Sequence, residues 1–494
     1  MDVIKVEGGH PITGEVGVEG AKNSALKLMA ATIMAPGVNT LTNVPNISDV
    51  HVMGKVLKRL GAKIDVLDEH TLVIDTTNVD KWEAPYELVV KMRASTAVMG
   101  PLLARFGKAV IAMPGGCNLG ARKIDMHILG LEALGVRFET THGNMHASAP
   151  NGIVGANVTL EFASVGATEN LIMASVHASG TTIIDNAARE PEIVDLANML
   201  NEMGAKITGA GTPVIQIEGV AALHPVTHAV VGDRIEAGTF IAAAGMTGGP
   251  IHVTGFKPEH LGLVLKKYEA MGMRIEREED GVVASADSRL KAVDIQTLPF
   301  PGFPTDMQAQ TMAMLALSDG QCVITENIFE NRFMFAGEIA RMGADIRVEG
   351  HHAIVRGVEG LSGAQVESPD LRGGAALVLA GLVAEGETTV SAIHHIERGY
   401  EHFVDKLGAL GAKVWRDTVP DVEIEDERMP AHSEWDPGKT GFYDFDRTTS
   451  GSSYHERMVR RTSRRRAIIV VAVALGVVLA VICGIVVAGG SSVK

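Results

Sequence analysis

The sequence predicts an α/β protein of two similar domains, built from repeated units and followed by a membrane-spanning tail. One phrase recurs about every 70 residues, as expected of a repeat: LGAKID (60–65), LGVRFE (134–139), MGAKIT (203–208), MGMRIE (271–276), MGADIR (342–347) and LGAKVW (410–415). Six units can form one solenoid or two groups of three. A body of about 420 residues favours two domains, because a single core stops growing near ~250–300 residues.

Each unit is expected to pack helices on a small sheet. The repeated phrase follows an apolar helical pattern such as VMGKVLKRL or IVDLANMLNEM, and its glycine suits the position that ends a helix. The alternating residues after the glycine predict a strand. A second set of strand-like runs follows Ala-rich helical segments: VNTLTNVP, GTTIIDNAA, GPIHVTGF, GQCVITEN and GETTVSAI.

The C-terminal tail differs in composition from the repeated body. Residues 467–488, AIIVVAVALGVVLAVICGIVVA, are uncharged, and as a helix they would be ~33 Å long, enough to cross a bilayer. RRTSRRR precedes this run, so the positive-inside rule leaves the body in the cytoplasm. Nothing at the N-terminus resembles a signal peptide. Residues 417–466, first acidic and then arginine-rich, predict a disordered tether whose basic half is drawn to anionic lipid.

Composition excludes several classes of function. The formal net charge of −15 argues against a nucleic-acid-binding protein, and it requires a local cluster of cations for any anionic substrate. The three cysteines, Cys117, Cys322 and Cys483, are far apart and lie in no CxxC or Cys/His pattern. A disulfide framework and a structural zinc site are therefore not expected.

Cys117 lies in the loop PGGCNLGARKID, residues 114–125. Two preceding glycines allow a tightly turned backbone. Arg122, Lys123 and His127 would lower the pKa of the Cys117 thiol and favour the thiolate. From the local sequence alone, the alternative is a cysteine that merely fills a loop.

Lys22 and Asn23, in VEGAKNSALKL, open a helical run after a glycine. This arrangement is either an anion site at a helix start or a surface lysine on a capped helix, and it is not a Walker A loop. Asp306, in FPGFPTDMQAQ, is either a helix N-cap or a general base.

Four arginines lie beside helix starts or a glycine in different units: Arg93, Arg332, Arg372 and Arg398. Each one alone is readily explained as a solvated charge. Together they suggest convergence on one anionic ligand, because helix N-termini and guanidinium groups both favour phosphate and carboxylate.

The ordered motifs resemble a known family. GAKNSALKL, MRAS, PGGCNLGARKIDMHI, SVGAT, NAAREPEIVDLA, GDRIEAGTF, FPTDMQAQ, ENRFM, LSGAQV, DLRGGAALVLAG and ERGYE are similar, in order, to the UDP-N-acetylglucosamine 1-carboxyvinyltransferases, a family of enolpyruvyl transferases. The resemblance covers residues 1–416 and implies an inside-out α/β barrel of two domains with three units each. In that fold residues 1–21 join residues 232–416, and residues 22–231 form the domain with the Cys loop.

The resemblance implies transfer of the enolpyruvyl group of phosphoenolpyruvate to the 3′-hydroxyl of UDP-N-acetylglucosamine, with no metal or organic cofactor. Catalytic roles fall to Cys117 as proton donor and transient nucleophile, Asp306 as base and Lys22. Cys117 is then also the residue that fosfomycin alkylates. The residues that match substrate contacts are Asn23, Arg93, Arg122, Lys123, Ile124, Asp125, Met126, Phe162, Ala163, Ser164, Val165, Ile328, Arg332, Arg372 and Arg398.

Two features depart from the family pattern. Ser48 stands where some members have a lysine that contacts phosphoenolpyruvate, and the tail lies outside the family's usual chain. The tail also motivates a different hypothesis, a regulatory or scaffolding paralogue that recruits wall-synthesis proteins to the membrane. A shikimate-type enolpyruvyl transferase is a third hypothesis, which the Cys loop and SVGAT disfavour.

Overall fold

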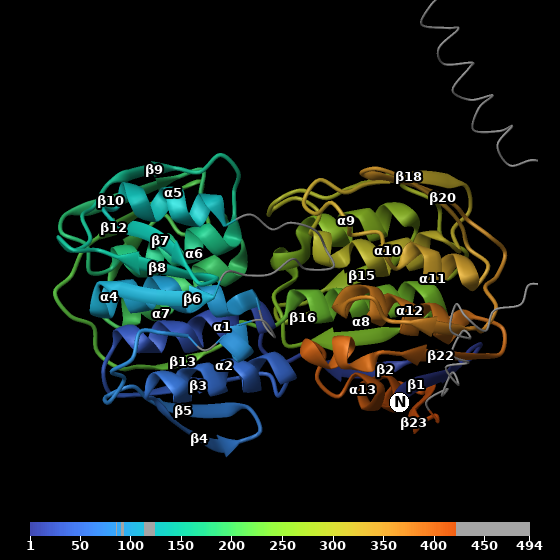
Figure 1. Ribbon diagram of the computed structural model, residues 1–494. Helices are drawn as coiled ribbons and strands as arrows, with labels where there is room; N and C mark the ends of the chain where they lie inside the picture. The colour runs from blue at the N-terminus through green and yellow to red at the C-terminus, as the bar shows by residue number, and fades with distance from the viewer. Residues whose placement is uncertain (85, 90–92, 113–123, 421–494) are drawn as a thin grey trace, which may run out of the picture. The chain divides into compact units, whose positions relative to one another are not determined.

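In the computed structural model, six small sheets surround two sets of buried helices (Figure 1). The structure describes residues 1–84, 86–89, 93–112 and 124–420, with the backbone alone for residues 89 and 93–95. Residues Met1–Asp421 form one compact unit. The predicted tether from residue 421 onward and the predicted membrane helix, 467–488, lie outside the described residues.

One order of elements recurs six times. A buried helix leads to a strand, a second helix and then two antiparallel strands. The buried helices are α1 (Lys22–Ala31), α4 (Met99–Phe106), α6 (Val165–Ser175), α8 (Arg234–Thr247), α10 (Gln308–Leu315) and α12 (Leu371–Val383). The second helices are α2 (Ser48–Leu60), α5 (Asp125–Ala133), α7 (Pro191–Glu202), α9 (Gly262–Met271), α11 (Ala336–Arg341) and α13 (Phe403–Ala409). The six-unit repeat predicted from the sequence is confirmed.

Three sheets belong to the first half of the chain. They run β13 (Thr227–Ala229), β3 (Val38–Thr42), β5 (Thr71–Asp75), β4 (Lys63–Asp68); β6 (Lys108–Ala112), β8 (Asn144–Ser148), β7 (Arg137–Thr141); and β11 (Lys206–Thr208), β12 (Val214–Glu218), β10 (Thr181–Asp185), β9 (Asn157–Thr159). In the three-stranded sheet, a parallel bridge from Glu83 to Val110 occupies the place of the fourth strand.

The other three sheets include the first two strands of the chain. They run β15 (Arg274–Arg277), β16 (Gly281–Ser285), β14 (Ile251–Thr254), β2 (Gly14–Gly17); β17 (Ile295–Gln296), β18 (Gln321–Thr325), β20 (His352–Arg356), β19 (Asp345–Glu349); and β21 (Gln365–Glu367), β22 (Glu387–Ser391), β1 (Asp2–Glu7), β23 (Lys413–Thr418). β1 pairs antiparallel with both β22 and β23 and so completes the sixth unit.

Short helices complete the secondary structure of the described residues. They are η1 (Thr32–Met34), α3 (Tyr86–Val89), η2 (Arg93–Val98), η3 (Pro258–Leu261), η4 (Thr305–Met307) and η5 (Ile393–Arg398).

The glycine of each repeated phrase has a left-handed backbone, with φ between 90° and 113°: Gly61, Gly135, Gly204, Gly272, Gly343 and Gly411. A residue with a Cβ is strained in that conformation, so glycine is the residue that ends these helices without cost. The next strand begins two residues later in each unit, which explains why the phrase recurs.

Two hydrophobic cores hold the described residues together. The first is built from residues 25–230, and the second from residues 4–18 and 235–410. We refer to the parts around them as the first and second lobes. The central helices of the second lobe, α8, α10 and α12, pack on one another and are buried almost all round. A helix that is apolar on every side belongs inside a core, with the sheets outside it.

Two antiparallel segments connect the lobes. Gly20 and Gly232 form a β-bridge, the Ala21 amide donates to the Val231 carbonyl, and the Asp233 amide donates to the Glu19 carbonyl at 2.8 Å. This crossing leads directly into Lys22 at the start of α1 and Arg234 at the start of α8.

The body extends slightly beyond the boundary expected from the sequence. β23 continues past residue 416 to Thr418, which pairs with Asp2, and the Val419 amide donates to the Met1 carbonyl. No helix in the described part of the chain is long and apolar enough to cross a membrane.

Candidate active site

Lys22 begins α1 and is buried, with 9% of its surface exposed. Its amide donates to Asp233 Oδ2 at 3.3 Å, and its Nζ lies 2.8 Å from Asp49 Oδ2. Asp49 belongs to the first turn of α2 and is 3% exposed. A buried carboxylate therefore holds the Lys22 ammonium group in place.

Arg398 reaches the same carboxylate from η5 of the second lobe. Its Nε donates to Asp49 Oδ1 at 3.0 Å and its Nη2 to Asp49 Oδ2 at 3.3 Å. The paired hydrogen bonds match the fork of a guanidinium to a carboxylate. Lys22 and Arg398, which the sequence predicts to bind the same anion, both contact Asp49. Asp49 itself was not predicted from the sequence.

The electrostatics of this group depend on burial and on the two cations. Burial is the largest influence on Lys22 and lowers the pKa of its ammonium group, while the Asp49 carboxylate opposes that shift. Burial alone would raise the pKa of Asp49, but the charge of Lys22 and the hydrogen bond from Arg398 outweigh it and hold that pKa below its usual value. Asp49 is therefore a fixed negative charge between two cations.

Asp306 lies inside the short helix η4 and is not the N-cap of α10, a position that Met307 takes. Its carboxylate accepts from Arg332 Nη2 at 2.9 Å and from Arg372 Nη2 at 3.2 Å. Both arginines are buried, at 3% and 2% exposed, while the Asp306 side chain is 27% exposed. The carboxylate is thus fixed by two guanidinium groups and still accessible.

The two arginines retain donors without acceptors. Arg332 Nε and Arg372 Nη1 are buried, and neither has a hydrogen-bond partner among the described residues. An unpaired donor on a buried charge is costly, so these atoms point to a bound anion that would accept from them.

The Asp49 and Asp306 groups are neighbours. A Cβ built on Gly399 would lie 3.1 Å from Lys22 Cδ and 2.8 Å from Leu371 Cδ2, so the backbone after Arg398 passes tightly between Lys22 and the start of α12. Asp370 caps α12 by accepting from the Arg372 and Gly373 amides, which fixes Arg372. Four cations therefore surround two carboxylates in one region, against the negative charge of the whole chain.

A second group of candidate residues lies at two helix starts of the first lobe. Ile124, Asp125 and Met126 begin α5, while Phe162, Ala163, Ser164 and Val165 lead into α6. The two helices pack together, and a Cβ on Gly166 would lie 3.1 Å from the His127 ring. Ser164 Oγ accepts from the Ala167 amide at 3.3 Å and so caps α6.

The remaining candidates divide between described and undescribed positions. Asn23 is exposed on α1, and Ser48 is exposed at the first position of α2, next to Asp49. Ile328 follows β18, where its amide donates to Glu326 Oε1, and no hydrogen bond or ion pair in the described residues joins it to α5 or α6. Arg93 starts η2, with only its backbone described. Cys117, Arg122 and Lys123 lie outside the described residues.

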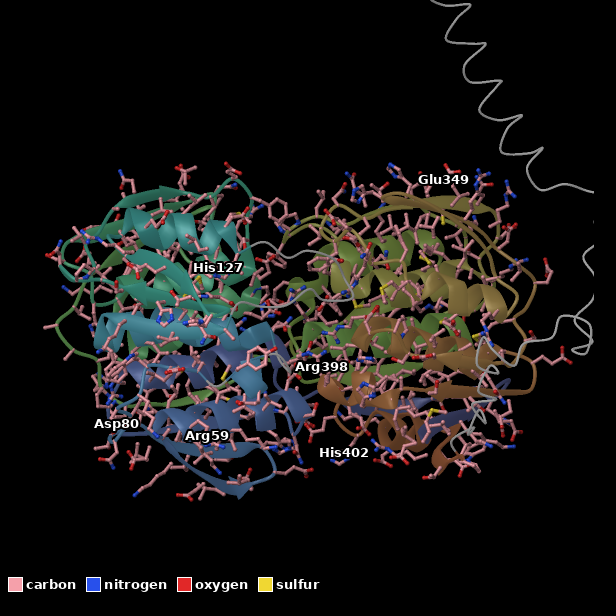
Figure 2. The ribbon with its side chains drawn as sticks, in the orientation of Figure 1. Arg59, Asp80, His127, Glu349, Arg398 and His402 are labelled. Carbon is pink, nitrogen blue, oxygen red and sulfur yellow. The ribbon has the colours of Figure 1, made fainter. Side chains whose placement is uncertain are left out.

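His127 does not support the thiolate in the way the sequence suggested. It is buried in α5, labelled in Figure 2, and Asn170 Nδ2 lies 3.1 Å from its Nδ1. Burial, helped by the charge of Lys27, lowers the pKa of His127 to about 4. The ring is therefore neutral at pH 7 and cannot serve there as a cation for Cys117.

Replacing His127 by glutamine is expected to flatten the acid dependence of stability. Between pH 6.5 and about 4 the unfolded chain binds a proton at His127 that the folded chain does not, so this residue's contribution falls as the pH falls. The loss amounts to about 3 kcal/mol below both pKa values. Urea unfolding near pH 7 and near pH 4.5 measures it, and an equal fall in the unfolding free energy of both proteins would contradict this assignment.

Comparisons with known proteins identify the relatives of this chain. The family model described as EPSP synthase (3-phosphoshikimate 1-carboxyvinyltransferase) matches residues 6–407. UDP-N-acetylglucosamine 1-carboxyvinyltransferase 1 of Staphylococcus aureus (strain MRSA252) and that of Staphylococcus epidermidis (strain ATCC 12228) are each 51% identical over 418 residues, covering 84% of this chain and 99% of the relative.

Solved structures show the same fold. The enolpyruvyl transferase NikO from Streptomyces tendae is 26% identical, covers 85% of this chain and 99% of its own, and superposes with a TM-score of 0.77. EPSP synthase from Acinetobacter baumannii, at 17% identity and a TM-score of 0.66, shares the fold alone. This chain belongs to the enolpyruvyl transferase family, among the UDP-N-acetylglucosamine 1-carboxyvinyltransferases.

Proposed function

We propose that this chain transfers the enolpyruvyl group of phosphoenolpyruvate to the 3′-hydroxyl of UDP-N-acetylglucosamine and releases phosphate, the first committed step of peptidoglycan precursor synthesis. The observation that carries the proposal is the cluster of Lys22, Arg398, Arg332 and Arg372 around two carboxylates, with two buried guanidinium donors unpaired. Both substrates are anions, and fixed cations of this kind stabilise them together with the charge that develops during reaction.

The reaction needs one acid and one base. The 3′-hydroxyl oxygen bonds to C2 of phosphoenolpyruvate as Asp306 takes the hydroxyl proton, and Cys117 gives a proton to C3. Loss of phosphate from C2 and of a proton from C3 restores the double bond. Asp306 suits the role of base because two arginines fix its carboxylate while part of it stays accessible.

The anion ligands of phosphoenolpyruvate in this proposal are Lys22, Asn23, Arg93, Arg122, Arg332, Arg372 and Arg398. The nucleotide sugar in this proposal lies against the starts of α5 and α6, at residues 124–126 and 162–165, and is also bound by Lys123 and Ile328. In this proposal the two lobes act as two domains, formed by residues 22–231 and by residues 1–21 with 232–416. Both domains contribute ligands of the two substrates. Support comes from the separate cores and from the crossing that leads into Lys22.

Product analysis tests the function directly. The full chain, incubated with phosphoenolpyruvate and UDP-N-acetylglucosamine, should yield a nucleotide sugar heavier by one enolpyruvyl group, identified by mass spectrometry and by the vinyl protons in NMR spectra. An unchanged nucleotide sugar would rule the proposal out. Product formation from shikimate 3-phosphate instead would establish the shikimate-type reaction.

Replacing Asp49 by asparagine is expected to shift the pH dependence of phosphoenolpyruvate binding. The Asp49 charge opposes the burial that lowers the pKa of Lys22, so without it Lys22 loses its proton at lower pH. The rise of the phosphoenolpyruvate KM with pH should begin at a lower pH in Asp49→Asn than in the wild type. Asp75→Asn, a change at the last residue of β5, where the carboxylate accepts from the Thr77 amide, should leave that profile unchanged. An identical profile in Asp49→Asn and the wild type would contradict the role of Asp49.

We further propose that residues 467–488 anchor the body to the inner face of the cell membrane, beside wall-synthesis proteins. Their lack of charge and the arginines before them support this proposal. The full chain should remain with membranes after alkaline carbonate extraction, whereas a chain ending at Asp421 should not. Release of the full chain by carbonate would count against an anchor.

A further inference from the structure

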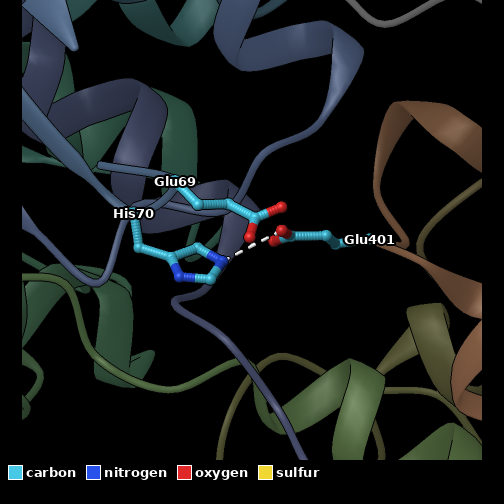
Figure 3. Close-up of side chains that lie close together, drawn as sticks. All are labelled: Glu69, His70 and Glu401. Carbon is cyan, nitrogen blue, oxygen red and sulfur yellow. Dashed lines mark hydrogen bonds and ion pairs between the residues drawn. The ribbon is translucent and has the colours of Figure 1, made fainter. Parts of the chain in front are cut away.

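A second contact between the lobes lies three residues beyond Arg398. Glu401 is 3% exposed and belongs to the second lobe. Its Oε2 accepts from the Asn46 amide at 2.8 Å. Its Oε1 lies 2.9 Å from His70 Nε2, as Figure 3 shows. Asn46 and His70 both belong to the first lobe. The segment from Arg398 to Glu401, whose start is labelled in Figure 2, thus binds the first lobe at both ends, at Asp49 and at Asn46 with His70.

The other side of this segment is fixed to the second lobe. The hydroxyl of Tyr400 is buried within hydrogen-bond distance of Thr239 Oγ1, at 2.9 Å, and of Gln310 Nε2, at 3.1 Å. Those partners belong to α8 and α10. The backbone that carries Arg398 can therefore shift away from the first lobe only if the Glu401 contacts change, and away from α8 and α10 only if the Tyr400 contacts change.

Two histidine side chains reach Glu401. In the described residues its ion-pair neighbours are His70, at 2.9 Å, and His402, at 3.8 Å. Other charged groups around His70 are acidic: Glu69 and Asp68 on its own hairpin, and Glu19 on the crossing segment at 3.9 Å. His402 pairs with Glu69 at 2.9 Å.

We infer that Glu401 and His70 are positioning residues that hold Arg398 against Asp49 and thereby set the affinity for phosphoenolpyruvate. The inference rests on the proposed function and on Arg398 as a ligand of that anion. Neither residue touches the reacting atoms in this assignment. Their contact acts on binding of the ground state and the transition state alike, so its loss should raise KM and leave kcat nearly unchanged.

The same cluster has the composition of a divalent-cation site. One ligand atom from each of Glu69, His70 and Glu401 lies within 4.8 Å of the others. Both oxygens of Glu401 already accept hydrogen bonds from protein groups, however, and Glu69 pairs with His402. We therefore assign the cluster to a contact between the two lobes of the chain and not to a metal site. Dependence of the His70→Leu effect on EDTA would contradict this assignment.

The test compares four forms of the full chain: wild type, His70→Leu, Glu401→Gln and the double variant. Each single change should raise the phosphoenolpyruvate KM about 5- to 20-fold near pH 6, with kcat within about twofold. The double variant should be no worse than the weaker-binding single one, because both changes break one contact.

His252→Leu is the matched control. His252 also lies between two glutamates, Glu15 at 3.1 Å and Glu278 at 3.0 Å, and its side chain is 29% exposed, against 32% for His70. It should leave KM and its pH profile unchanged. His70→Gln, which keeps an N–H donor at this position, should recover part of the affinity that His70→Leu loses.

Three outcomes would overturn the inference: equal losses in kcat and affinity, additive effects in the double variant, or a difference between wild type and His70→Leu that disappears with EDTA. Calorimetric binding of phosphoenolpyruvate gives the same comparison without turnover. A chain that binds phosphoenolpyruvate, shows these affinity differences and makes no product would refute the proposed function and leave this inference standing. A Glu401→Gln enzyme that is active and binds phosphoenolpyruvate with unchanged affinity would refute this inference and leave the proposed function standing.

Discussion

Asp306→Asn is expected to lower kcat about 10³-fold, the range typical of a lost general base. An amide cannot take the proton of the sugar hydroxyl, yet it keeps an oxygen that accepts from Arg332 or Arg372. The loss should therefore appear mainly in kcat, with the fold retained. Steady-state rates and urea unfolding of the same preparation measure both effects.

Asp287→Asn is a suitable control for this change. Asp287 is exposed and pairs with Arg274 at 3.5 Å on the surface, so its loss should alter neither rate nor stability noticeably. If Asp306→Asn kept more than about a tenth of the wild-type kcat, Asp306 would not be the base. A large loss of stability with an unchanged kcat would mean that Asp306 serves to hold the two buried arginines in place.

Cys117→Ser is expected to remove most turnover, by about 10²- to 10³-fold, because a hydroxyl is a far weaker acid than a thiol. Cys117→Asp should stay active, since a carboxyl group can also donate the proton to C3. Both rates come from the phosphate-release assay. An inactive aspartate variant would mean that the covalent adduct, and not proton donation, is obligatory.

Fosfomycin gives a chemical test of the same residue. The wild type should be alkylated at Cys117 and lose activity. Cys322 is an internal control in the same peptide map: it is 2% exposed, and burial raises the pKa of its thiol to about 12, so it should stay unmodified. Labelling of Cys322 in preference to Cys117 would contradict the assignment.

The sequence predicted the repeat well because the repeat is local. Each helix ends at a glycine that adopts φ near +100°, and the following alternation predicts a strand, so six copies could be recognised within short windows. The assignment of β1 and β2 to the second lobe came only from the family resemblance. Their partners, β22, β23 and β14, lie hundreds of residues away, where no local pattern reaches.

In the candidate site, too, residues with a local sequence signal were predicted, and residues that depend on distant partners were not. Lys22, Asp306, Arg332, Arg372 and Arg398 are predicted from the sequence as residues beside helix starts or beside a glycine. Asp49 and Glu401 were missed, because their partners come from distant segments: Arg398 lies 349 positions from Asp49, and Asn46 lies 355 positions from Glu401. An acidic residue in the first turn of α2 was the available signal for Asp49, but it also fits an ordinary helix-dipole interaction.

Release of inorganic phosphate by the full chain tests the central claim most directly. With phosphoenolpyruvate and UDP-N-acetylglucosamine together, phosphate should appear in step with consumption of both substrates, and it should be absent when either is omitted. The Asp306→Asn and Cys117→Ser proteins should release almost none. No phosphate from the wild type with both substrates, or release that requires shikimate 3-phosphate in place of the nucleotide sugar, would contradict the account.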